Sequence, residues 1–182
     1  MLKACHVLWV FSMVDPHSCF VSLYNVSMIP RIFVGVDAGT TTGIAVLRTT
    51  GDGWIAAHEQ IVGPHEAAYW LRKHCEGQFV ELVYETFYIG NRTLKAGKKG
   101  VFDALRLVGW IEIEIKEWIG CRIYPQSPSV GKTVSADAIK AMGLYNPAMR
   151  HANDAMRHIV RHHLTNLPKS PVTKQYLEAV KI

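Results

Sequence analysis

Three acidic residues and one histidine stand at points of the chain where they could share one site. Asp37 and Glu85 each end an apolar run, while His151 and Asp154 lie three residues apart at the start of a late helical segment. Two carboxylates at the ends of neighbouring strands repel each other unless a cation lies between them. Oxygen ligands with one imidazole nitrogen suit Mg²⁺ or Mn²⁺ better than a structural zinc. A pair of such ions could activate water and stabilise the leaving oxygen of a phosphodiester.

Each of these residues also has an ordinary structural explanation. Asp37 could be a turn residue whose charge is compensated by a salt bridge or a ligand hydrogen bond rather than by a cation. Glu85 could be a charge at a sheet edge, Asp154 an acid on a helix surface and His151 a residue near a helix N-terminus. These explanations carry less weight jointly than singly, so the set as a whole favours a metal site.

A segment rich in glycine and threonine follows Asp37 and leads into a second apolar run. This pattern predicts a hairpin that presents Asp37 at a strand end. We expect Gly39 and Gly43 to adopt backbone conformations that side chains would forbid. The hydroxyls of threonines 40–42 could bind phosphate or satisfy backbone groups of the turn.

The remaining apolar periodicity predicts an α/β domain with a mixed five-stranded sheet flanked by helices. Beyond the hairpin, we expect strands over 54–62, 79–85 and 121–124, and helices over 66–75, 101–118, 135–142 and 147–164. Pro125 is expected to stop the last strand, and the helix over 101–118 is apolar enough to serve both the sheet and a second subunit. We assign residues 28–167 to the domain and leave 168–182 as a C-terminal tail.

Composition limits the classes of protein to which the chain can belong. Its 182 residues allow one domain with a sizeable core, and its net charge of +5 favours a polyanionic partner such as nucleic acid. The four cysteines show no metal-binding spacing, so we expect reduced thiols and a cytoplasmic protein. The apolar stretch 7–11 is too short to span a bilayer, and we expect no membrane partner. We interpret residues 1–27 as an extension upstream of a natural start at Met28, in preference to a secretory signal.

Three segments resemble the motif series of RuvC-like Holliday junction resolvases of the RNase H-like superfamily, especially the bacteriophage versions. These segments are Val34–Gly39, Val83–Glu85 and His151–Ala155. The resemblance implies an RNase H-like fold, a homodimer in the cytoplasm of the host cell if phage-encoded, and two-metal-ion cleavage of Holliday junctions, forks or flaps. It also implies that Asp37, Glu85, His151 and Asp154 form the metal site. The family has either Asp or His at the position of His151, so this chain follows one variant.

The same resemblance suggests residues that contact DNA. Lys132 matches in order a lysine that follows the penultimate strand in this family, where a cation could stabilise charge on the phosphoryl group. An ordinary surface lysine is the alternative. A basic loop beyond Glu85 could bind the DNA backbone, and aromatic residues at its root could stack on unpaired bases or anchor the loop to the core. The basic residues are Arg92, Lys95, Lys98 and Lys99, and the aromatic ones are Phe87 and Tyr88.

Other functions remain open at this point. The segment Asp37–Thr41 also resembles the first phosphate loop of the sugar kinase, actin and heat-shock chaperone superfamily. That group needs a second equivalent domain, for which this chain is too short, so we expect no nucleotide cofactor. A noncatalytic DNA-binding module of the same fold and a ribonuclease H acting on RNA:DNA hybrids are the remaining alternatives, because shared metal chemistry does not define the substrate.

Overall fold

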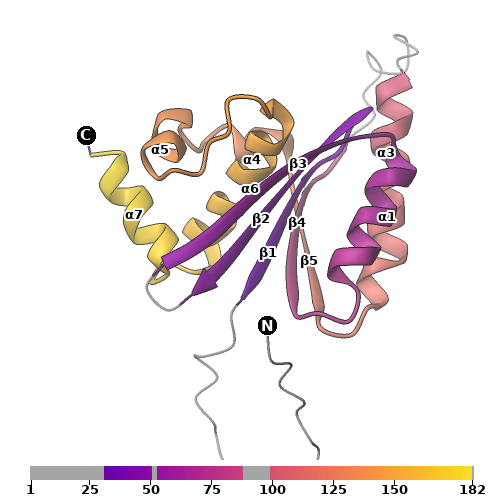
Figure 1. Ribbon diagram of the computed structural model, residues 1–182, viewed down its shortest axis with the longest axis horizontal. Coiled ribbons are helices and arrows are strands. Elements are labelled where there is room, and N and C mark those ends of the chain that lie inside the picture. Colours follow the sequence, from indigo (N-terminus) through magenta and orange to yellow (C-terminus); the bar gives the residue numbers. More distant parts are fainter. Residues whose placement is uncertain (1–30, 51–52, 88–98, 182) are drawn as a thin grey trace, which may run out of the picture.

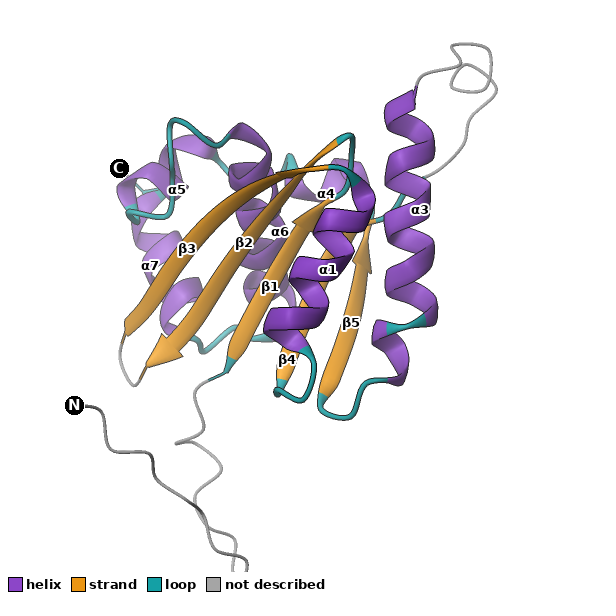
Figure 2. Ribbon diagram, turned by 45° about the vertical axis from the view of Figure 1, so that its right-hand side comes forward, coloured by secondary structure: helices purple, strands orange, loops and turns teal. Residues whose placement is uncertain are grey.

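The computed structural model describes residues 31–50, 53–87 and 99–181, which form one five-stranded sheet with helices on both faces (Figure 1). The strands are β1 (Ile32–Asp37), β2 (Thr41–Thr50), β3 (Gly53–Val62), β4 (Val80–Glu85) and β5 (Cys121–Gln126). Their order in the sheet is β3-β2-β1-β4-β5 (Figure 2). Strand β1 pairs antiparallel with β2 and parallel with β4, and β4 pairs parallel with β5. The expected α/β class with a mixed five-stranded sheet is confirmed, and the sheet is compatible with an RNase H-like fold.

The helices divide between the two faces of the sheet (Figure 1). One face is covered by α1 (Pro64–Cys75) and α3 (Lys99–Ile113), which continues into a short 3-10 helix, η2 (Ile115–Glu117). The other face carries α4 (Pro128–Gly131), α5 (Ala136–Ala141), α6 (Arg150–Asn166) and α7 (Pro171–Ala179). Successive side chains of β1 point to opposite faces of the sheet. Phe33 is buried against α6, while Val34 and Val36 are buried against α1 and α3.

Several boundaries differ from the sequence expectation. Strand β5 continues through Pro125 to Gln126. It lies at the edge of the sheet, where a proline that lacks an N–H costs no ladder hydrogen bond. The long helix ends at Ile113 before the 3-10 turn, and α6 begins at Arg150 rather than at residue 147.

The segment that we set aside as a C-terminal tail carries helix α7. Ser170 caps this helix by accepting a hydrogen bond from the backbone N–H of Thr173. Val172 and Tyr176 are buried in the same core as α5 and α6. Residues 171–179 therefore pack as part of the domain.

The glycines near Asp37 serve a different purpose from the one expected. Neither Gly39 nor Gly43 adopts a left-handed backbone conformation. A Cβ on Gly43 would instead overlap the carbonyl group of His151, and one on Gly35 would overlap the carbonyl oxygen of Ala155. Because these two positions lack side chains, α6 lies directly against β1 and β2, which brings its first turn to the end of β1.

Residues 1–30 lie outside the described residues, and with them the expected extension 1–27 and the proposed start at Met28. Within the ranges given above, no helix has both the length and the apolar character needed to cross a membrane.

Candidate active site

Asp37 and Glu85 end neighbouring parallel strands. Val36 pairs with Tyr84, so the next residue of each strand lies at the same end of the sheet, where both strands finish. Both carboxylates lie on the face that α6 covers, and both line one cavity. The expectation that these two strands are neighbours is confirmed.

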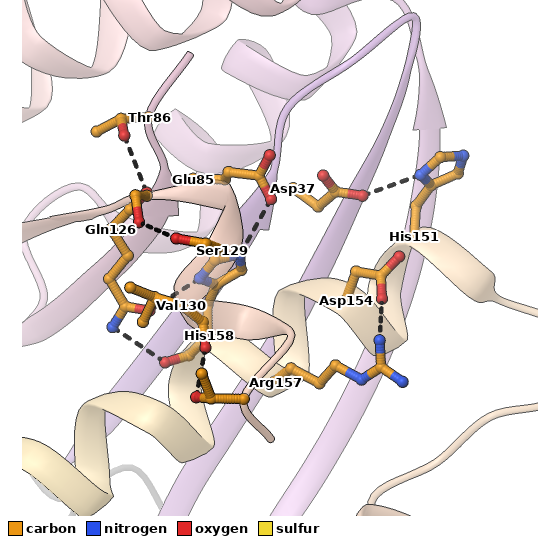
Figure 3. Close-up of polar contacts among 12 residues, drawn as sticks. Asp37, Glu85, Thr86, Gln126, Ser129, Val130, His151, Asp154, Arg157 and His158 are labelled. Carbon is orange, nitrogen blue, oxygen red and sulfur yellow. Dashed lines mark hydrogen bonds and ion pairs between the residues drawn. The ribbon is translucent and has the colours of Figure 1, made fainter. Parts of the chain in front are cut away.

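Helix α6 contributes the other two expected residues. Its first turn is held by Gln60 on β3, whose side-chain oxygen accepts the backbone N–H of His151 at 2.9 Å. The buried amide of Asn153 accepts the backbone N–H of Asn146 at 2.8 Å and donates to its carbonyl at 2.7 Å, which fixes the turn before the helix. In this position His151 Nδ1 lies 2.9 Å from Asp37 Oδ2 (Figure 3).

A cavity of about 640 Å³ collects the acidic residues and several cations. Three carboxylates and His151 line it together with Lys132, Arg150 and Arg157. The remaining lining residues are Ala38, Gly39, Pro128, Gly131, Ala136, Tyr145, Asn153 and His158. A cavity lined by both carboxylates and cations has the charges needed to bind both a metal ion and a phosphate group.

The carboxylates disturb one another electrostatically. Burial raises the pKa of Asp37 from 3.8 to about 6, although the hydrogen bond with His151 opposes this, and the charges of Glu85 and Asp154 raise it further. A bound cation would relieve the repulsion that these three carboxylates share.

All three carboxylates already have basic partners, and that of Asp37 is His151 (Figure 3). Arg157 Nη1 lies 2.8 Å from Asp154 Oδ1, and His158 Nε2 lies 3.1 Å from Glu85 Oε2. Among the residues with described positions, no group of three or more His, Cys, Asp or Glu side chains is arranged to hold a metal ion. The donor set fits a divalent cation in its chemistry, and such a cation must compete with Arg157 for Asp154.

The structure brings together some of the expected residues and leaves others untested. Asp37, Glu85, His151, Asp154 and Lys132 all line the cavity. Phe87 is half-buried and lies outside the cavity's described lining. Tyr88, Arg92, Lys95 and Lys98 lie outside the described residues, as does the side chain of Lys99 at the start of α3.

Sequence reasoning assigned no role in the site to Arg157, His158 or Gln126. His158 had a visible signal, because it lies four residues after Asp154 and therefore on the same helical face. Gln126 had none, since only the pairing of β5 with β4 places it beside Glu85.

No protein-family model matches the chain, and no curated protein is significantly similar to it. The fold and the site define an α/β protein with a cluster of acidic residues at the carboxyl ends of its central parallel strands.

Proposed function

We propose that this protein is a RuvC-like endonuclease of the RNase H-like superfamily that uses Mg²⁺ or Mn²⁺ to cleave Holliday junctions and other branched DNA. The observation that carries the proposal is the convergence of Asp37, Glu85, His151 and Asp154 on one cavity from three distant parts of the chain. A core-stabilising role would not require three carboxylates in one cavity, since their mutual repulsion is unfavourable.

Each residue then has a role. The carboxylates of Asp37, Glu85 and Asp154 would hold the metal ions, and His151 would act as a ligand or share a proton with Asp37 through Nδ1. Divalent ions in such a site activate water and stabilise the leaving oxygen, which leaves a 5′-phosphate and a 3′-hydroxyl. Lys132 and Arg150 line the same cavity, where they would hold the scissile phosphate.

The pairing of Asp154 with Arg157 favours one alternative, a noncatalytic DNA-binding module in which the arginine has replaced the metal. Cleavage assays separate the two functions. A labelled four-way junction would be compared with a fork, a linear duplex and an RNA:DNA hybrid in the presence of Mg²⁺, Mn²⁺ or EDTA. Metal-dependent nicking of junction and fork but not of duplex supports the proposal.

The other results would each contradict it. Binding without cleavage in any metal would favour the noncatalytic module, and preference for the hybrid would indicate a ribonuclease H. The matched variant is Asp37→Asn, which removes a ligand and a negative charge but leaves the cations in place. It should abolish cleavage and keep or improve junction binding, whereas loss of both would contradict this division of roles.

A further inference from the structure

Strand β4 and helix α6 are joined by two similar pairs of glutamate and histidine. His158 Nε2 lies 3.1 Å from Glu85 Oε2, and His162 Nε2 lies 2.9 Å from Glu81 Oε2. Both histidines are 1% exposed. Glu85 and His158 adjoin the cavity, whereas Glu81 lies four residues before Glu85 in β4 and His162 lies four residues after His158 in α6. The two pairs have the same chemistry but differ in their distance from the candidate site.

Gln126 determines how the ring of His158 is oriented. Its side-chain Nε2 donates to the backbone carbonyl of His158 at 3.3 Å, and its Oε1 accepts from His158 Nδ1 at 2.8 Å (Figure 3). The opposite orientation of the amide would place two carbonyl oxygens against each other. Nδ1 therefore carries a hydrogen. Because the Glu85 carboxylate only accepts hydrogen bonds, Nε2 must carry a second hydrogen to donate to it, and the contact is then an ion pair between the imidazolium of His158 and Glu85.

The surroundings leave the ring little freedom. The carbonyl of Gln126 accepts hydrogen bonds from the N–H and the hydroxyl of Thr86, at 2.7 and 3.0 Å, which fixes the ends of β4 and β5 together. Gly131 packs against the ring so closely that a Cβ there would lie 2.9 Å from His158 Nε2. A buried imidazole with both nitrogens engaged and a glycine against it stays in one orientation.

We propose that His158 is a positioning residue that holds Glu85 Oε2, so that the other carboxylate oxygen is presented to the cavity. This inference rests on the proposed function, because it assigns to Glu85 the role of a metal ligand. Glu85 then binds the cation through an oxygen whose direction is set before the metal arrives. Without His158, the carboxylate must be ordered at the moment of binding, which weakens the affinity for the cation.

Two amide substitutions at position 158 test this role. The amide nitrogen of glutamine reaches about as far as Nε2 of histidine, whereas that of asparagine reaches only about as far as Nδ1. His158→Gln therefore keeps the donor to Glu85, and His158→Asn loses it. His162→Gln and His162→Asn make the same two changes in the pair with Glu81 and serve as matched controls.

The readouts are Mn²⁺ affinity, measured by electron paramagnetic resonance, and kcat and KM on a four-way junction. We expect His158→Asn to weaken Mn²⁺ binding by about 10- to 100-fold and to lower kcat with little change in KM. His158→Gln should restore most of both. The two His162 variants should match the wild type in both, even where thermal unfolding shows that they are less stable.

Should His158→Asn fail to fold, a second variant tests the same role. Gln126→Met frees the ring but keeps both His158 and Glu85, and it should also weaken Mn²⁺ binding.

Several outcomes would overturn the inference. His158→Asn could bind Mn²⁺ and cut like the wild type, His158→Gln could lose as much as His158→Asn, or the His162 variants could lose as much as their counterparts. Any of these would make His158 an ordinary core residue while leaving the proposed function intact. A wild-type protein that neither binds Mn²⁺ nor cuts DNA would instead overturn the proposed function, and the inference with it.

Discussion

Asp37 is the residue whose ionisation the site makes most costly. Burial, together with the charges of Glu85 and Asp154, raises its pKa from 3.8 to about 6. An acid with a higher pKa in the folded state destabilises that state as pH rises between the two values. We therefore expect Asp37→Asn to be more stable than the wild type at pH 7, by on the order of 1 to 3 kcal/mol, and to lose this advantage below about pH 4. Urea unfolding across this pH range measures the difference.

The control for this prediction is Asp137→Asn on α5, where the side chain is 90% exposed. It should show no comparable gain between pH 4 and pH 7, because an exposed carboxyl is not desolvated on folding. Adding Mg²⁺ should raise the stability of the wild type more than that of Asp37→Asn. A gain for Asp37→Asn that persists unchanged at low pH would show that its cause is packing and not charge.

The acidic residues of the site could be predicted from the sequence, whereas their partners could not. Asp37 and Glu85 each end an apolar run, and strand ends are visible in the order of residues. The contact between Asp154 and Arg157 depends on rotamers, and that between His158 and Gln126 depends on which strand lies at the sheet edge. Such choices are made by tertiary packing, which a single sequence does not display.

At the scale of elements, the close approach of α6 to β2 positions the site. A Cβ on Gly43 would overlap the backbone carbonyl of His151, and neither backbone can move without disturbing the sheet or the helix. We expect Gly43→Ala to destabilise the protein by about 1 to 3 kcal/mol and to weaken Mn²⁺ binding, because the first turn of α6 must shift. Urea unfolding and a Mn²⁺ titration measure the two effects.

Gly109 in α3 offers the matched control, since nothing lies within 4 Å of a Cβ placed there. Gly109→Ala should stabilise the protein by up to about 1 kcal/mol, because alanine favours the helix more than glycine does. If Gly43→Ala behaved like Gly109→Ala, α6 would not lie against β2 as closely as the structure shows.

His163 ties α6 to α7 and should make the protein sensitive to acid. Its Nδ1 lies 3.0 Å from Ser170 Oγ, its Nε2 is buried with no hydrogen-bond partner among the described residues, and its ring centroid lies 4.3 Å from that of Phe33. Burial, with the charge of His162, lowers its pKa from 6.5 to about 3. Because the unfolded chain takes up the proton first, this residue should reduce stability as pH falls from about 6.5 toward 3.

Replacing His163 should make the free energy of unfolding depend less on pH in the acidic range. We expect the wild type to lose on the order of 3 kcal/mol over that range through His163, and His163→Leu to lose correspondingly less. The mutation also removes the contact with Ser170, which changes the free energy of unfolding at every pH. The readout is therefore the slope of the free energy of unfolding against pH, and not its value. His65→Leu on the exposed part of α1 should leave the slope unchanged. Equal slopes for wild type and His163→Leu would contradict the prediction.

Elements with strong apolar periodicity were predicted well, and elements defined by context were not. The third strand, expected over 54–62, is β3 (Gly53–Val62), and the fourth, expected over 79–85, is β4 (Val80–Glu85). Helix α7 was missed although Ser170 and Pro171 form a helix-start signal, because the segment is short and its apolar residues are few. The predicted end of β5 at Pro125 was wrong, because only the order of strands in the sheet shows that β5 is an edge strand.

At the scale of the whole molecule, the sheet separates a layer that is mainly apolar core from a layer that contains the candidate site. Helices α1 and α3 cover one face with an almost wholly apolar core, and α6 lies on the other face (Figure 1). Helix α6 contributes His151, Asp154, His158 and His162 to that face. The site lies where β1 and β4 end and α6 begins, so three elements must be assembled before all three of its carboxylates meet. Folding and formation of the site are therefore coupled.

Under the proposed function, the net charge of +5 would attract DNA to the whole surface, and the salt dependence of binding would measure how many cations take part. Lys132 and Arg150 line the cavity, so each should contact a phosphate of a bound junction. We expect Lys132→Ala and Arg150→Ala each to reduce the slope of log K against log salt concentration by about 1, with weaker binding to every branched substrate. Lys174→Ala on the exposed surface of α7 removes the same charge away from the cavity and should leave the slope unchanged. Equal effects of all three variants would mean that DNA follows the overall charge of the molecule and not the cavity, which would separate DNA binding from the acidic site.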